Sequence, residues 1–144
     1  MENKNILLIC SQSNYDKVKD IKEKLESKGY SVITPNGYGE ESFSNKDKKM
    51  DDKEYEEFFR RMFYESKEKI SKVNAVLVLN YNKIKNEKIY KNYIGASTFL
   101  EMYEAYMQNK KIFIMKELVE SILYDEIKGF SPIIINDDLN NIVL

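Results

Sequence analysis

The residues best suited to chemistry lie in one stretch, residues 93–106, which reads Tyr-Ile-Gly-Ala-Ser-Thr-Phe-Leu-Glu-Met-Tyr-Glu-Ala-Tyr. Gly95 allows a tight backbone turn, and Ser97 or Thr98 can cap the unpaired amides of a helix start. Glu101 follows within the first turn, where the positive end of the helix dipole favours a negative charge. A carboxylate held ionised in this way suits a nucleophile. The stretch therefore predicts Glu101 as a candidate nucleophile.

The same spacing also has a purely structural interpretation. Thr98 and Glu101 are three residues apart, which is the spacing of a capping box, in which the glutamate bonds back to the amide of the cap residue. The local sequence fits either role. The choice between them depends on where the rest of the chain places this stretch.

Composition limits the chemistry that is available. The chain of 144 residues fits a single domain, residues 1–144, with one core. It has no histidine and one cysteine, Cys10, which excludes Ser-His and Cys-His nucleophile pairs, His-containing zinc sites and thiolate clusters. A GxGxxG loop, a GxxxxGK[ST] loop and an acidic trio for Mg²⁺ are also missing, so we expect no metal and no cofactor.

Charge and hydropathy point to no extended partner. Lysine and arginine number 23 and aspartate and glutamate 24, so no basic field attracts nucleic acid or an anionic membrane. Cys10 lies in an apolar run, which is typical of an inert thiol in a reducing compartment. With no signal peptide and no long apolar segment, the sequence predicts a soluble, cytoplasmic protein.

Short apolar runs alternate with amphipathic segments along the chain. In the first amphipathic segment, apolar residues recur at the spacing of one helical stripe, and Gly29 ends it. Helices are predicted between residues 14 and 29, 51 and 70, 97 and 109, and 119 and 128. Strands are predicted over residues 5–10, 31–34, 73–80, 111–115 and 132–136.

This alternation predicts a single-domain α/β fold, a flavodoxin/Rossmann-like three-layer sandwich with a five-stranded parallel sheet in the order 2-1-3-4-5. Ligands of such sheets bind at the carboxyl ends of the strands, at the switch point between strands one and three. Residues 11–14 and 80–101 meet there. The topology thus brings Glu101 to the ligand crevice, and this favours the nucleophile over the cap.

Polar side chains in these two segments are candidate substrate-binding groups. Such groups hydrogen-bond sugar or phosphate, although each also has a structural alternative, which is to cap a helix, end a strand or pack. Glu104, three residues after Glu101, is interpreted as a solvated helix charge. The candidates are Ser11, Gln12, Ser13, Asn80, Tyr93, Gly95, Ser97 and Thr98.

Two polar segments are too long or too exposed for routine connections. Residues 37–50 are lysine-rich and are interpreted as a solvated linker or a mobile loop, and residues 83–92 as an exposed excursion or lid. The apolar stripe over residues 55–70 is more aromatic than one small sheet needs. Part of it is a candidate subunit interface, with core packing as the alternative.

Four motifs spread over nearly the whole chain carry a resemblance. They are Ile-Leu-Leu-Ile-Cys-Ser at residues 6–11, Gly-Tyr-Ser-Val at residues 29–32, Ala-Val-Leu-Val-Leu-Asn at residues 75–80, and the stretch around Gly95 and Glu101. In these motifs the chain resembles the nucleoside 2-deoxyribosyltransferase superfamily, which includes 2'-deoxynucleoside 5'-monophosphate N-hydrolases. The resemblance implies that Glu101 attacks C1' of a (deoxy)ribosyl group, and that water or a second base resolves the glycosyl-enzyme intermediate.

The resemblance also implies a small-molecule nucleoside or nucleotide as substrate and a homo-oligomer in which a neighbour completes the pocket. The chain departs from the family pattern at Tyr103, where the family has glycine, and at Asn74, where an acid is usual. The family's catalytic aspartate has no secure match, since Glu65 and Ser66 lie near its place and Glu65 is the only acid. These departures leave open a non-catalytic nucleotide-binding or sensing module on the same fold.

Overall fold

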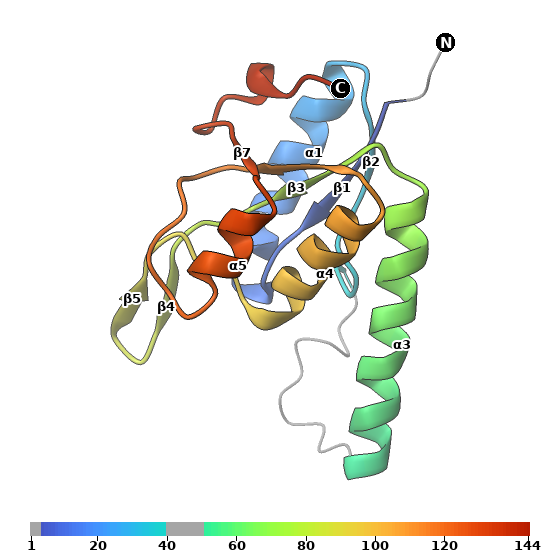
Figure 1. Ribbon diagram of the computed structural model, residues 1–144, viewed down its shortest axis with the longest axis vertical. Helices are drawn as coiled ribbons and strands as arrows, with labels where there is room; N and C mark the ends of the chain where they lie inside the picture. Colours follow the sequence, from blue (N-terminus) through green and yellow to red (C-terminus); the bar gives the residue numbers. More distant parts are fainter. Residues whose placement is uncertain (1–3, 40–50) are drawn as a thin grey trace.

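A computed structural model describes residues 4–39 and 51–144 and contains a five-stranded parallel sheet with helices on both faces (Figure 1). The strand order is β2-β1-β3-β6-β7. Because the strands of this sheet are consecutive apart from a separate hairpin, this is the predicted order 2-1-3-4-5, and the predicted α/β fold class is confirmed. The strands are β1 (Asn5–Ile9), β2 (Ser31–Ile33), β3 (Ala75–Val78), β6 (Lys111–Ile114) and β7 (Ile133–Ile134).

The central strands are buried on both faces, as their continuous apolar runs require. Side chains alternate along each strand, so the core divides into two clusters, one on each face of the sheet. Leu8 and Leu77, paired in the register of β1 and β3, belong to one cluster, and their neighbours Leu7 and Val76 belong to the other.

Helices cover both faces of the sheet. The 3₁₀ helix η1 (Gln12–Lys17) leads into α1 (Val18–Ser27), which packs on the first cluster together with the C-terminal segment containing η2 (Leu139–Asn141). The other face carries α3 (Asp52–Ser71), α4 (Ala96–Met107) and α5 (Tyr124–Gly129), and the N-terminal half of α3 extends beyond the sheet (Figure 1). The side chains that anchor these helices are Val18, Ile21, Leu25, Ile70, Met102 and Ile127.

Two predicted segments differ in the structure. Residues 83–92 form an antiparallel hairpin of β4 (Lys83–Lys85) and β5 (Lys88–Tyr90), joined by two residues with positive φ, the backbone that a tight hairpin turn demands (Figure 1). The last helix is shorter than predicted, because the Ser121 hydroxyl accepts a hydrogen bond from the Leu123 amide and makes a turn immediately before it. Most of the predicted 37–50 loop lies outside the described residues.

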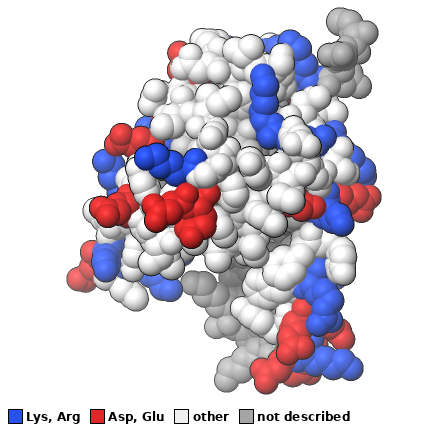
Figure 2. Space-filling model, in the orientation of Figure 1, with Lys and Arg blue, Asp and Glu red and all other residues white. Residues whose placement is uncertain are grey.

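The surface carries charges of both signs. On the face shown in Figure 2, basic and acidic side chains are interspersed over the helices. Within residues 4–39 and 51–144, no helix is long and apolar enough to cross a bilayer.

The buried amide of Asn14 joins η1 to the end of β3. It is 1% exposed, and its Nδ2 donates to the Leu79 carbonyl at 2.9 Å. We expect Asn14→Ala to lower the free energy of unfolding by about 1–3 kcal/mol, because the substitution leaves a buried carbonyl unpaired. Urea denaturation measures this loss. Ser13→Ala in the same segment is the control and should change the free energy by less than about 0.5 kcal/mol, and an equal loss in both variants would contradict the assignment.

Candidate active site

A cavity of about 810 Å³ opens among the described residues at the carboxyl ends of the strands. Its walls come from the segments that follow β1 and β2, from α3 and from the start of α4. This is the predicted switch point between β1 and β3, and the volume falls within the range of small-molecule sites. The walls are strongly aromatic, with Tyr15, Phe58, Phe59, Phe63, Tyr64, Tyr93 and Tyr103.

Glu101 lines this cavity from the second turn of α4. The helix begins at Ala96 with Gly95 as its N-cap, so Thr98 lies inside the helix, only 2% exposed. Glu101 Oε2 accepts a hydrogen bond from the Ser66 hydroxyl of α3 at 3.2 Å, and Oε1 has no hydrogen-bond partner among the described residues. The capping-box interpretation is therefore wrong, since the carboxylate is directed into the cavity and not back to its own helix start.

Burial raises the pKa of Glu101 to about 7. The hydrogen bond from Ser66 and the positive charge of Lys69 lower the pKa, but they are outweighed by the loss of solvent. The expectation that the helix dipole holds Glu101 ionised is thus wrong. The dipole acts over the first turn, whereas Glu101 lies one turn further along the helix.

Ser66 is itself held by Asn36, which follows β2. Asn36 Nδ2 donates to Ser66 Oγ at 2.7 Å, and the Tyr15 hydroxyl donates to the Asn36 carbonyl at 2.7 Å. Asn36 Oδ1 is buried and has no hydrogen-bond partner among the described residues. The amide is therefore held through its nitrogen, and Asn36, Ser66 and Glu101 form one chain of hydrogen bonds. Sequence reasoning missed Asn36 entirely.

Glu65, the candidate acid, does not line the cavity. Its carboxylate lies 3.7 Å from Arg61 Nε, one turn earlier on α3. Its neighbour Ser66 faces Glu101 instead. Helical periodicity contains this signal, because Phe59, Phe63 and Ser66 recur at a spacing of three or four residues, while Glu65 is turned about 100° away from Ser66.

Of the predicted binding residues, the structure brings Ser11, Gln12, Tyr93, Gly95, Ser97 and Thr98 to the cavity, but not Ser13 or Asn80. Ser13 Oγ donates to Ser11 Oγ at 3.2 Å. Asn80 is fully buried, and its amide pairs with the backbone N–H and carbonyl of Lys116, each at 2.9 Å. Its side chain joins the ends of β3 and β6, which is the strand-end alternative.

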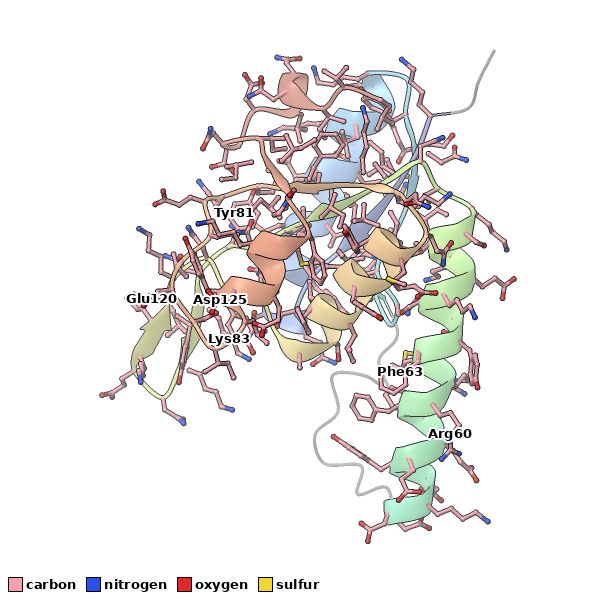
Figure 3. All side chains as sticks on the ribbon, in the orientation of Figure 1. Arg60, Phe63, Tyr81, Lys83, Glu120 and Asp125 are labelled. Carbon is pink, nitrogen blue, oxygen red and sulfur yellow. The ribbon has the colours of Figure 1, made fainter. Side chains whose placement is uncertain are left out.

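Tyr93 packs against Gly95, the residue that precedes α4. A Cβ on Gly95 would lie 3.2 Å from the Tyr93 hydroxyl oxygen, so the glycine leaves room for the tyrosine. Lys83 Nζ lies 4.6 Å from the centroid of the Tyr93 ring. Figure 3 shows Lys83, the first residue of β4, and Phe63 on α3, on either side of α4 in this view.

Several charged residues of the lining were not recognised in the sequence. Arg60, Lys67 and Lys83 are basic residues of the lining. Glu104 also lines it, partly buried, with Oε1 accepting from the Gln108 side chain at 3.0 Å. The interpretation of Glu104 as a solvated charge is therefore wrong. These residues are ordinary surface types in the sequence, and only the folded arrangement of α3, α4 and the β4–β5 hairpin brings them together.

Cys10 also lines the cavity, at the end of β1. Burial raises the pKa of its thiol to about 12, and the nearby Glu101 charge adds to the shift. A thiol that stays protonated is a poor nucleophile. Cys10 is thus an inert wall of the cavity, as its apolar run predicts.

A second groove of about 680 Å³ lies between α1 and the C-terminal segment. Its lysines and aspartates largely neutralise one another, since Lys24 lies 2.9 Å from Asp20 and Lys116 pairs with Asp137. Because the carboxylates of this groove are paired with lysines, the cavity of Glu101 is the candidate active site.

Fold and site together define a parallel α/β protein with a buried carboxylate at its switch point. No group of three histidine, cysteine, aspartate or glutamate residues in the described parts of the chain could hold a metal ion. Comparison of the chain with protein-family models, curated proteins and solved structures found no match.

The raised pKa of Glu101 makes stability depend on pH. The folded pKa of about 7 exceeds the ordinary value of 4.5, so the folded state loses stability as pH rises from about 4.5 through 7. We expect Glu101→Gln, which keeps the shape without the charge, to be more stable than the parent at pH 8 by about 1–3 kcal/mol, and equally stable near pH 4.5.

Denaturation with urea at a series of pH values measures this difference. Glu68→Gln is a matched control, because Glu68 is exposed on α3 and pairs with Lys72 at 3.2 Å. It should stay within about 0.5 kcal/mol of the parent throughout. A parallel pH dependence for the parent and Glu101→Gln would show that Glu101 is not the titrating group.

Proposed function

We propose that this protein cleaves or transfers the N-glycosidic bond of a nucleoside or nucleoside 5'-monophosphate, as members of the nucleoside 2-deoxyribosyltransferase superfamily do, with Glu101 as the nucleophile. One observation carries the proposal. The Glu101 carboxylate faces an aromatic cavity at the sheet's switch point, with Oε2 held by Ser66 and Oε1 without a hydrogen-bond partner among the described residues.

The lining suits the parts of such a substrate. Aromatic side chains stack on nucleobases and accept any base through its π-face. Hydroxyls at the rim, such as those of Ser11 and Ser97, are suited to a sugar, and cations such as Arg60 and Lys67 to a 5'-phosphate. The volume of about 810 Å³ accommodates a ligand of nucleotide size.

In the proposed reaction a Glu101 oxygen attacks C1' of the sugar, and the bond from C1' to the base nitrogen breaks. The base leaves with that electron pair and takes up a proton. Water or a second base then attacks C1' and releases Glu101, so two displacements retain the configuration. Glu104 is the other carboxyl group among the described residues of the lining, and we assign it the proton transfer to the base.

We expect the parent protein to release free base, or to exchange it in the presence of an acceptor base. Because the nucleophile must be charged and its pKa is raised to about 7, kcat/KM should rise between pH 6 and pH 8. Glu101→Ala should lose activity by about 10³-fold or more. Chromatography of reactions with deoxynucleosides and their 5'-monophosphates measures both effects.

Glu68→Gln serves as the control in these assays and should keep the parent activity. The proposal fails if no tested nucleoside or nucleotide is turned over, or if Glu101→Ala is as active as the parent.

A second candidate function is a nucleotide-binding or sensing module without catalysis. The position of Glu65 favours it, because the described residues of the cavity include no acid at the place where the resemblance implies one. Such a module would melt at a higher temperature with nucleotide, would keep this shift in Glu101→Gln, and would form no product.

We further propose that the protein acts in the cytoplasm as a homo-oligomer. The exposed aromatic side chains of α3 support an interface, since Tyr55, Phe63 and Tyr64 are 56%, 50% and 68% exposed. A monomeric mass by light scattering would contradict it.

A further inference from the structure

We propose that Ser66 and Asn36 are a positioning pair that stabilises the charged form of the Glu101 carboxylate and fixes its Oε2, so that Oε1 is the oxygen presented to the sugar. This assignment deepens the proposed function and rests on it for the identity of the reaction. Its claim about the ionisation of Glu101 is independent of any substrate.

The direction of the hydrogen bonds carries the inference. The Asn36 amide nitrogen can only donate, so the Ser66 oxygen receives that hydrogen bond at 2.7 Å. The single hydroxyl proton of Ser66 is then left for Glu101 Oε2, at 3.2 Å. Oε2 therefore accepts a hydrogen bond, and a charged carboxylate oxygen accepts one more strongly than a neutral carboxyl oxygen does. The chain of bonds thus favours the charged form and opposes the effect of burial.

The buried amide oxygen of Asn36 lowers the stability of the fold, and a purely structural role does not explain why it is present. The Asn36 nitrogen donates to Ser66 Oγ at 2.7 Å and, more weakly, to the Met62 carbonyl at 3.5 Å, while Oδ1 of the same amide is buried without a partner among the described residues. Buried polar atoms of this kind are rare, and an apolar side chain of similar shape would avoid the cost. Local arrangements that oppose stability are typical of functional sites.

Other charged groups face the same carboxylate and must be separated from the pair. Lys69 acts on Glu101 from α3, and the Cys10 thiol faces it from the end of β1. Arg60 and Lys67 on α3, Lys83 on β4 and Glu104 on α4 line the same cavity. Variants of Ser66 and Asn36 leave all of these in place, so a change in Glu101 reports the pair.

The test combines carboxyl titration with kinetics on the full chain. The first measurement follows the ¹³C carboxyl signal of Glu101 by NMR as the pH changes. In Ser66→Ala we expect the midpoint to rise by about one pH unit or more, because a hydrogen bond to the charged form is lost. The second measurement is turnover, where kcat at pH 7 should fall by about tenfold or more while KM changes less than about twofold.

Three further variants make the test specific. Ser66→Thr keeps the hydroxyl and should restore most of the midpoint and of kcat. Ser71→Ala removes an exposed hydroxyl from the same helix and should change neither. Asn36→Ala should raise the midpoint in the parent but not in Ser66→Ala, because Asn36 acts only through Ser66.

The outcomes decide the proposal in either direction. It is overturned if the midpoint of a folded Ser66→Ala variant equals that of the parent, if kcat is unchanged, or if the effects of Asn36→Ala and Ser66→Ala are additive. If the parent turns over no nucleoside, the proposed function fails, and with it the presentation of Oε1 to a sugar. The titration then still shows whether the pair sets the charge of Glu101.

Discussion

The organising constraint of this protein is a carboxyl group kept out of water at the edge of a hydrophobic core. Glu101 lies on α4 beside α3, among side chains that raise its pKa to about 7. A carboxylate in bulk water would be fully ionised and weakly reactive. Partial desolvation makes its charge less favourable and strengthens every interaction it makes, so each neighbouring dipole acquires a larger effect on chemistry.

The strands of the sheet hold their carboxyl ends in fixed positions, and the segments that follow these ends provide the residues of the site. The parallel order brings the segments after β1, β2 and β3 to one edge. The buried amide of Asn14 joins η1 to the end of β3 through the Leu79 carbonyl, and the buried amide of Asn80 joins the ends of β3 and β6 through the Lys116 backbone. These two amides are satisfied by backbone, whereas Glu101 Oε1 has no hydrogen-bond partner within residues 4–39 and 51–144.

The sequence predicts the fold well and the site only in part, for physical reasons. Continuous apolar runs and one helical stripe determine the sheet order, and the topology then brings Glu101 to the switch point. Whether Ser66 or Glu65 faces the cavity depends on the rotation of α3 about its axis. The hydrogen bond from Asn36 to Ser66 joins residues that are 30 apart in the sequence. The start of α4 at Ala96 rather than Thr98 moves Glu101 out of reach of the helix dipole. The last two features follow from tertiary packing, which local spacing does not encode, whereas the periodicity of the aromatic stripe on α3 already indicates the rotation that favours Ser66.

Ser66 beside Glu101 has a consequence for how the proposed chemistry is divided. A second carboxylate at that position would repel the charge of Glu101 and raise its pKa further, whereas a hydroxyl stabilises the charge without competing for a proton. Under the proposed function, a serine therefore favours attack and gives up the acid that the leaving base requires. The proposed reaction then takes that proton from elsewhere in the lining, where Glu104, three residues along the same helix, is the carboxyl group to which we assign the step. This proposal assigns charge stabilisation to α3 and both carboxyl groups to α4, so the proposed reaction depends on the contact between these two helices.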